Sequence, residues 1–169
     1  MYSNNRIDGK ELAKEWLREL KGKNTSERYL VGFVSEDNAA GHSFQKAKRR
    51  AARWVGIEYL IIEISESSTE KLVSLIQEQA RDKNCGGIVV QLPLPAYFNT
   101  EKILDAIPAE KDPDVLGTSA KEKSEKEDWI IPPPARVVSL LLEKQSQKLE
   151  DLSVAIVGMG RLIGEAIAP

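Results

Sequence analysis

The chain has 169 residues, 41% of them hydrophobic, and its 24 basic and 26 acidic residues give a formal net charge of −2. A chain of this size can bury a substantial core and hold one domain together with part of another. The balanced charge gives no electrostatic reason to expect a nucleic acid or an anionic membrane as a partner, so a small-molecule ligand is favoured.

A single cysteine, Cys85, limits the redox and metal chemistry of the chain. It excludes an intramolecular disulfide and a metal cluster held by cysteines, and we expect no metal site. No segment has the apolar length of a signal peptide or of a membrane span. These features predict a cytoplasmic protein.

Strands and helices alternate through the first half of the chain. Apolar residues spaced three or four apart predict a helix after Asp8, which is suited to cap it. Further along, β-rich runs alternate with helical patterns, and residues 36–41 are typical of a turn. The predicted elements are strand 28–35, helix 43–55, strand 57–65, helix 68–82 and strand 86–92. Their alternation predicts an α/β fold, a three-layer domain around a mostly parallel sheet.

The second half of the chain shows fewer regular patterns. A short helix is predicted near residues 100–106, and the charge run 121–128 is typical of a solvated loop. Residues 135–144 have the pattern of a helix that links two domains. From residue 152 a buried strand is predicted to run into a glycine turn, as at the start of a Rossmann domain. One strand and one turn cannot complete such a domain, so we expect the sequence to be truncated there.

The segment GGIVVQLPLP, residues 86–95, ends a predicted strand with a glutamine and two prolines. Ligands of open parallel sheets bind beyond the carboxyl ends of the strands, where Gln91 lies. Pro93 and Pro95 lack a backbone N–H and cannot continue a central strand, so they hold the exit path in one conformation. The segment is either a ligand-binding edge or a rigid loop with an exposed glutamine.

The predicted helix 43–55 places one charged side chain on its apolar face. At about 100° per residue, most basic side chains fall opposite an apolar arc formed by Phe44, Ala47, Ala51, Ala52 and Val55. Lys48 falls inside this arc. Its side chain either extends past the core edge to water or sits in a pocket where it can exchange a proton.

These motifs, in this order, resemble the methylenetetrahydrofolate dehydrogenase/cyclohydrolase family. The segments that carry the resemblance are IDGKELAKE, KAKRRAARWVGI, GGIVVQLPLP, IPAEKDPDVLG and VGMGRLIGEAIAP. The resemblance implies a folate-binding catalytic domain over 1–120, a charged loop and linking helix over 121–150, and the start of an NAD(P)-binding Rossmann domain over 151–169. It further implies oxidation of 5,10-methylenetetrahydrofolate with NADP or NAD, possible hydrolysis of the methenyl product, tetrahydrofolate derivatives as ligands, and a homodimer.

The resemblance implies roles for five residues of the first domain. Lys48 matches the family lysine that assists hydrolysis by proton transfer or by activating water, and Gln91 matches the glutamine that hydrogen-bonds this lysine. Asp114 matches the carboxylate that grips the pterin ring, although an aspartate after a proline is also ordinary in a turn. Phe44 and Pro93 are expected to contact the substrate. The family usually has tyrosine at position 44, so here the stacking surface is kept and the hydroxyl is lost.

The glycine turn carries the implied cofactor site. Its expected contacts are Gly158, Gly160, Arg161 and Gly164, where the glycines allow close approach to a pyrophosphate and the arginine is a candidate phosphate contact. Met159 and Gly160 stand where the family has an Arg-Ser pair that receives the phosphate of NADP, and Gly164 lies one position beyond the usual glycine register.

Two departures in the first domain leave other functions open. Val115 stands where the family usually has glycine, and residues 132–135 are PPPA in place of Pro-Cys-Thr-Pro. A second hypothesis is therefore a degenerate or truncated folate-binding protein without catalysis. A third, an unrelated Rossmann-type oxidoreductase, would not explain Lys48 and the QLPLP motif together.

Overall fold

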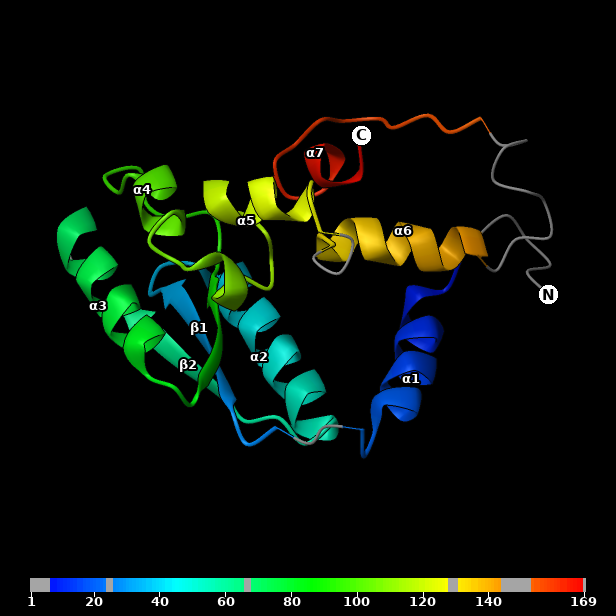
Figure 1. Cartoon of the computed structure of the whole chain (residues 1–169), viewed down its shortest axis with the longest axis horizontal. Coiled ribbons are helices and arrows are strands. Elements are labelled where there is room, and N and C mark those ends of the chain that lie inside the picture. The colour runs from blue at the N-terminus through cyan, green and yellow to red at the C-terminus, as the bar shows by residue number, and fades with distance from the viewer. Residues whose placement is uncertain (1–6, 24–25, 66–67, 128–130, 144–152, 169) are drawn as a thin grey trace.

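The computed structural model of the chain describes residues 7–23, 26–65, 68–127, 131–143 and 153–168. Its elements are α1 Gly9–Leu20, β1 Tyr29–Ser35, α2 Ala39–Trp54, β2 Tyr59–Ile64, α3 Thr69–Arg81, β3 Cys85–Val90, α4 Thr100–Leu104, the 3-10 helix η1 Ala109–Lys111, α5 Thr118–Ser124, α6 Pro133–Glu143 and α7 Gly164–Ile167 (Figure 1). Among these described residues, no helix has the length and apolar character needed to cross a membrane.

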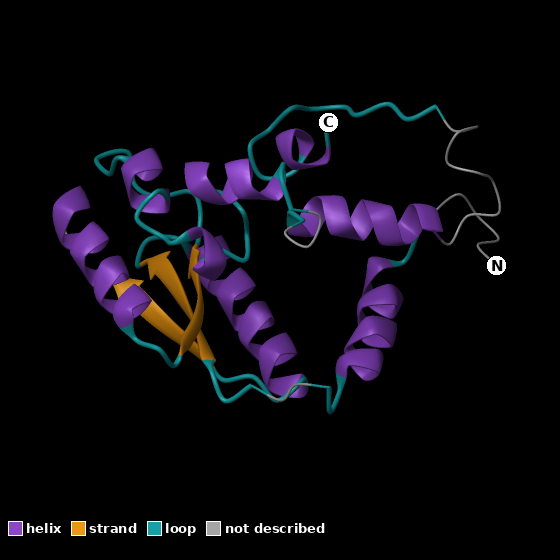
Figure 2. Cartoon of the chain, in the orientation of Figure 1, coloured by secondary structure: helices purple, strands orange, loops and turns teal. Residues whose placement is uncertain are grey.

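The fold is built on a parallel three-stranded sheet with the order β2-β1-β3. The central strand β1 pairs with β2 on one side and with β3 on the other, so that Gly32 lies opposite Ile61 and Val89. Helix α2 covers one face of the sheet and α3 covers the other (Figure 2). This arrangement confirms the predicted three-layer α/β fold. Because the strands are parallel, their carboxyl ends meet at one edge of the sheet.

Side-chain caps determine where the main helices begin. Asp8 caps α1 and Ser68 caps α3, as the sequence predicted. Helix α2 begins earlier than predicted, because the Asn38 side chain accepts a hydrogen bond from the backbone N–H of Gly41 at 2.7 Å. The prediction of a turn over 36–41 was therefore wrong for residues 39–41. Small residues there carry no apolar periodicity, so the cap is the only local signal of the helix start.

The apolar core lies mainly between the sheet, α3 and α4. Its fully buried side chains include Val31, Phe33, Leu72, Ile76, Ile88 and Ile103. Burial of each such side chain stabilises the fold by roughly 1.5–3 kcal/mol. Helix α2, by contrast, buries only Gly41, Gln45 and Ala52. The side of α2 that packs on the sheet thus consists of small and polar residues.

Two predictions for the second half of the chain were wrong. Residues 121–124, at the start of the charge run predicted as a loop, lie in α5; residue 128, where that run ends, lies outside the described residues. The strand predicted from residue 152 does not form within residues 153–168, where Val154 and Val157 are 64% and 99% exposed. A strand needs a neighbour for its N–H and C=O groups, and the described part of the chain provides none beside this segment.

Candidate active site

Two residues far apart in the sequence meet beside the sheet. Lys48 projects from α2, and Asp114 lies in the loop that follows η1. The Lys48 Nζ donates a hydrogen bond to Asp114 Oδ2 at 2.9 Å, across 66 positions of sequence. The side chains of Lys48 and Asp114 are 34% and 27% exposed, so a ligand can reach both. This pair forms the centre of the candidate site.

The inward direction of Lys48 is confirmed, but the predicted apolar arc of α2 is misplaced. The stripe that faces the sheet runs through Gly41, Gln45 and Ala52, and half-buried Lys48 lies on it. Phe44 is 63% exposed, so its ring points away from the core. The prediction followed the apolar residues of the helix, whereas the structure buries a glutamine. A stripe at positions 41, 45, 48 and 52 has helical spacing, but its residue types gave no apolar signal.

Gln91 lies directly after β3, as predicted, and its backbone N–H continues the ladder by donating to the carbonyl of Phe33 at 2.8 Å. Its side-chain amide is held by two partners. The Nε2 donates to the carbonyl of Leu92 at 2.9 Å, and the Oε1 accepts from the Nε2 of Gln45 at 3.4 Å. In the described residues the partner of Lys48 is Asp114, so the expected contact between Gln91 and Lys48 is not made in this structure.

The loop that carries Asp114 is held in place by its neighbours. The carboxylate of Asp112 is 5% exposed and accepts hydrogen bonds from the backbone N–H groups of Asp114, Leu116 and Gly117. Burial raises the pKa of the Asp112 carboxyl, while the N–H groups of Gly117 and Leu116 act in the opposite direction. Lys111 ties the loop to the end of α3, donating to the carbonyls of residues 80 and 82 at 2.7 and 2.8 Å. Neither anchor could be predicted from the sequence, because any lysine or aspartate in a turn has the same local pattern.

Val115, directly after Asp114, has a backbone conformation that is unusual for its type. Its φ is +53°, in the left-handed region, and its side chain is 4% exposed. This region favours glycine and is costly for a β-branched residue. The glycine expected from the family pattern would adopt it without strain.

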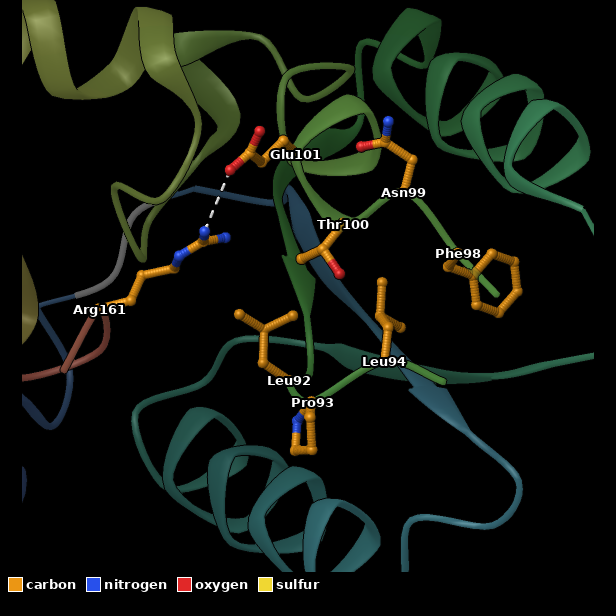
Figure 3. Close-up of a pocket in the computed structure, with 8 residues that line it drawn as sticks. All are labelled: Leu92, Pro93, Leu94, Phe98, Asn99, Thr100, Glu101 and Arg161. Carbon is orange, nitrogen blue, oxygen red and sulfur yellow. Dashed lines mark hydrogen bonds and ion pairs between the residues drawn. The ribbon is translucent and has the colours of Figure 1, made fainter. Parts of the chain in front are cut away.

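Pro93 borders a cavity of about 520 Å³ between the QLPLP loop and the glycine turn (Figure 3). Leu92, Pro93 and Leu94 line one side. Arg161 enters from the other and forms an ion pair with Glu101 at 3.2 Å. The candidate phosphate contact Arg161 is therefore engaged by a carboxylate in this structure.

The glycine turn packs closely against itself. Gly158 has a φ of +95°, and a Cβ at Gly164 would overlap the carbonyl oxygen of Gly158 and lie 2.7 Å from the Cα of Met159. Gly160 has open space at its Cα. The turn leads into α7, which has only four residues, and no strand precedes it among residues 153–168. The described residues thus leave open space beside Gly158 and Gly160 but do not form a complete dinucleotide site.

The described residues include no group of three or more His, Cys, Asp or Glu side chains placed to hold a metal ion. The fold and the Lys48–Asp114 pair together define an α/β domain with a partly exposed lysine–aspartate site beside its parallel sheet. The model of the tetrahydrofolate dehydrogenase/cyclohydrolase catalytic domain matches residues 7–114. The chain therefore belongs to the tetrahydrofolate dehydrogenase/cyclohydrolase family, which confirms the resemblance seen in its motifs.

Similar proteins extend over nearly the whole chain. It is 30% identical to the bifunctional protein FolD of Mycoplasmopsis synoviae, over 96% of this chain and 62% of that protein, and 33% identical to that of Rickettsia typhi, over 98% and 61%. The crystal structure of the bifunctional FolD dehydrogenase/cyclohydrolase of Campylobacter jejuni has a TM-score of 0.86 at 28% identity, over 95% of this chain and 60% of that one.

A second solved structure has a bound cofactor. The Trypanosoma brucei dehydrogenase-cyclohydrolase, complexed with NADP and an inhibitor, has a TM-score of 0.88 at 25% identity, over 99% of this chain and 61% of that one. The chain thus spans about three-fifths of the length of the relatives it matches.

Proposed function

We propose that the chain carries the tetrahydrofolate site of a methylenetetrahydrofolate dehydrogenase/cyclohydrolase. Such an enzyme oxidises 5,10-methylenetetrahydrofolate by hydride transfer to a nicotinamide cofactor and hydrolyses the methenyl product, in one-carbon metabolism. The observation that carries the proposal is the Lys48–Asp114 pair, in which two family motifs meet at 2.9 Å. The proposed catalytic domain extends over 1–120, with the linker over 121–150 and the nucleotide-binding region from 151.

Each site residue has a proposed role. The Asp114 carboxylate accepts hydrogen bonds from adjacent N–H donors of the pterin ring. Those donors compete with Lys48 for Asp114, so substrate binding releases the ammonium to exchange a proton with the methenyl bridge or the attacking water. Gln91 orients the released lysine. The exposed ring of Phe44 offers a stacking surface, and Pro93 forms a rigid wall.

The cofactor in this proposal is NADP or NAD, which accepts the hydride when bound. Support comes from the glycine turn, where Gly158 and Gly160 leave open space for a pyrophosphate and Gly164 lets the turn pack closely against itself. Arg161 would contact a phosphate after leaving Glu101. The proposal also includes a homodimer, as the resemblance implies.

A folate-binding protein without catalysis is the second candidate. The observation that favours it is Phe44, which supplies no hydroxyl and whose ring is 63% exposed. In this alternative Asp114 still binds the pterin, but Lys48 transfers no proton.

Replacement of Lys48 by methionine separates these functions. Met retains the apolar length of the lysine stem, so K48M should fold normally. General acid–base catalysis typically contributes about 10²–10⁴-fold, so K48M should slow hydrolysis of 5,10-methenyltetrahydrofolate by at least about 100-fold. The matched control is K46M, on the exposed side of the same helix, which should stay within about twofold of the unmodified chain.

The unmodified chain decides between the candidates. Folate binding with hydrolysis that depends on Lys48 supports the enzyme. Folate binding without hydrolysis, measured by the methenyl absorbance, supports the binding protein. If a tetrahydrofolate derivative does not bind in calorimetry, both are wrong.

A further inference from the structure

A row of hydrogen-bonded polar side chains, Tyr59, Gln45 and Gln91, lies between α2 and the sheet, beneath the candidate site. The Tyr59 hydroxyl, from β2, donates to Gln45 Oε1 at 2.6 Å. The Gln45 Nε2, from α2, donates to Gln91 Oε1 at 3.4 Å, and the Gln91 Nε2 donates to the Leu92 carbonyl at 2.9 Å. Gln45 is completely buried and Tyr59 is 4% exposed. Buried amides and hydroxyls cost free energy unless they are hydrogen-bonded, so this hydrogen-bonded row needs an explanation.

The donor and acceptor roles along this hydrogen-bonded row are set at its outer end, at Leu92. The Leu92 carbonyl can only accept, so Gln91 must present its NH₂ there and its oxygen toward Gln45. Gln45 must then turn its own NH₂ toward Gln91 and its oxygen toward Tyr59, whose hydroxyl is left as the donor. Burial raises the pKa of that hydroxyl well above its usual range, and the charge of Asp114 acts in the same direction. Tyr59 therefore remains a donor at neutral pH.

Gly32 of the central strand makes room for this arrangement. A Cβ at this position would overlap Gln45 Oε1 and lie 2.5 Å from the Tyr59 hydroxyl. The space above Gly32 is thus filled by these two polar groups and by nothing larger. No other part of the proposed mechanism uses them.

We infer that Gln45 and Tyr59 are positioning residues that act together with the Leu92 carbonyl and hold the Gln91 side-chain amide in one of its two orientations. The effect of this positioning on catalysis rests on the proposed function. An amide rotated by 180° has nearly the same shape, but its donor and acceptor are exchanged. With the hydrogen-bonded row intact, Gln91 presents to the site one remaining N–H and one remaining lone pair of Oε1 in fixed places.

The test replaces Tyr59 by phenylalanine, with Tyr29→Phe as the matched control. The Tyr29 hydroxyl also hydrogen-bonds a glutamine, Gln79, and the carboxylate of Asp82, but these residues belong to α3 and its end, on the opposite face of the sheet. Both variants lose one tyrosine hydroxyl. Only Y59F removes the donor at the inner end of the hydrogen-bonded row that holds Gln91.

The first readout needs no catalysis. In ¹⁵N NMR spectra of the full chain, assigned by comparison with Gln91→Glu, Y59F should shift the Gln91 side-chain NH₂ signals and speed their hydrogen exchange by about threefold or more, while Y29F leaves both unchanged. Unchanged Gln91 signals in Y59F, or equal changes in both variants, overturn the inference whether or not the chain is an enzyme.

The second readout is hydrolysis of 5,10-methenyltetrahydrofolate. Loss of one hydrogen bond that orients Gln91 should lower kcat by about 3-fold to 30-fold in Y59F, with KM changed less than about twofold and Y29F unaffected. Equal losses of kcat in both variants would mark a general structural effect and overturn the inference. If the unmodified chain does not hydrolyse the substrate, the proposed function fails, and the Gln91 signals alone decide the inference.

Discussion

The backbone at Val115 allows a test of strain beside the candidate site. A left-handed φ of +53° costs an L-residue about 1–2 kcal/mol, and Val115 also packs its buried side chain against Ala120 and Ala109. Strain and packing therefore oppose each other at this position. Two replacements, V115A and V115G, separate them.

The expected magnitudes predict that glycine costs unusually little at this position. V115A removes two methyl groups at about 0.8 kcal/mol each and keeps most of the strain, so it should destabilise the protein by about 1.5 kcal/mol. The further change to glycine relieves about 1–2 kcal/mol of strain, against about 0.5–1 kcal/mol for the greater freedom of the unfolded chain and about 0.8 kcal/mol for the buried carbon that is lost. V115G and V115A should therefore differ in stability by less than about 1 kcal/mol.

Urea denaturation of both variants, followed by circular dichroism, measures this difference directly. The matched control is Ala120→Gly, at a buried position in α5 with ordinary helical geometry. There the change from alanine to glycine should cost about 2 kcal/mol, from helix propensity and the buried carbon that is lost. If the change from V115A to V115G costs as much as A120G does, the backbone at Val115 is not strained and the reasoning is refuted.

Two further predictions concern the supports of the site. Gly32→Ala should destabilise the protein by about 1–3 kcal/mol, because its Cβ overlaps Gln45 Oε1; in a double-mutant cycle measured by urea denaturation, G32A and Q45A together should cost about 1 kcal/mol less than their sum, and strict additivity would argue against the overlap. Asp112→Asn should cost about 1–2 kcal/mol and weaken folate binding, because one of the three N–H donors loses its acceptor. Since burial raises the pKa of Asp112, this group's contribution to stability falls as the pH rises from the usual aspartate range through the raised pKa, and D112N should lack that component of the pH profile; an identical profile would contradict this.

Much of the fold could be predicted from local patterns along the chain. The alternation of β-rich runs with helical spacing was enough for a parallel sheet covered on both faces, and caps such as Asp8 and Ser68 marked helix starts. These predictions held because caps and periodicity act within a few residues of sequence. The strand from residue 152 failed for the opposite reason, since a strand depends on a partner that its own sequence does not contain.

The candidate site divides in the same way. The positions of Lys48 on the inner stripe of a helix and of Gln91 at the end of a strand followed from the sequence. The sequence motifs also identified the family, because a motif depends only on residue types and their order along the chain.

Only the tertiary structure decided which of these side chains meet. It placed Lys48 against Asp114, turned Phe44 outward, and connected Gln91 through Gln45 to Tyr59. A helical wheel ranks positions by apolar character, so it could not anticipate that a glutamine would occupy the most buried place on α2. The burial of Gln45 depends on the Tyr59 hydroxyl from β2 and on the absence of a side chain at Gly32 in β1. The register between these strands brings both to Gln45, and local sequence does not specify that register.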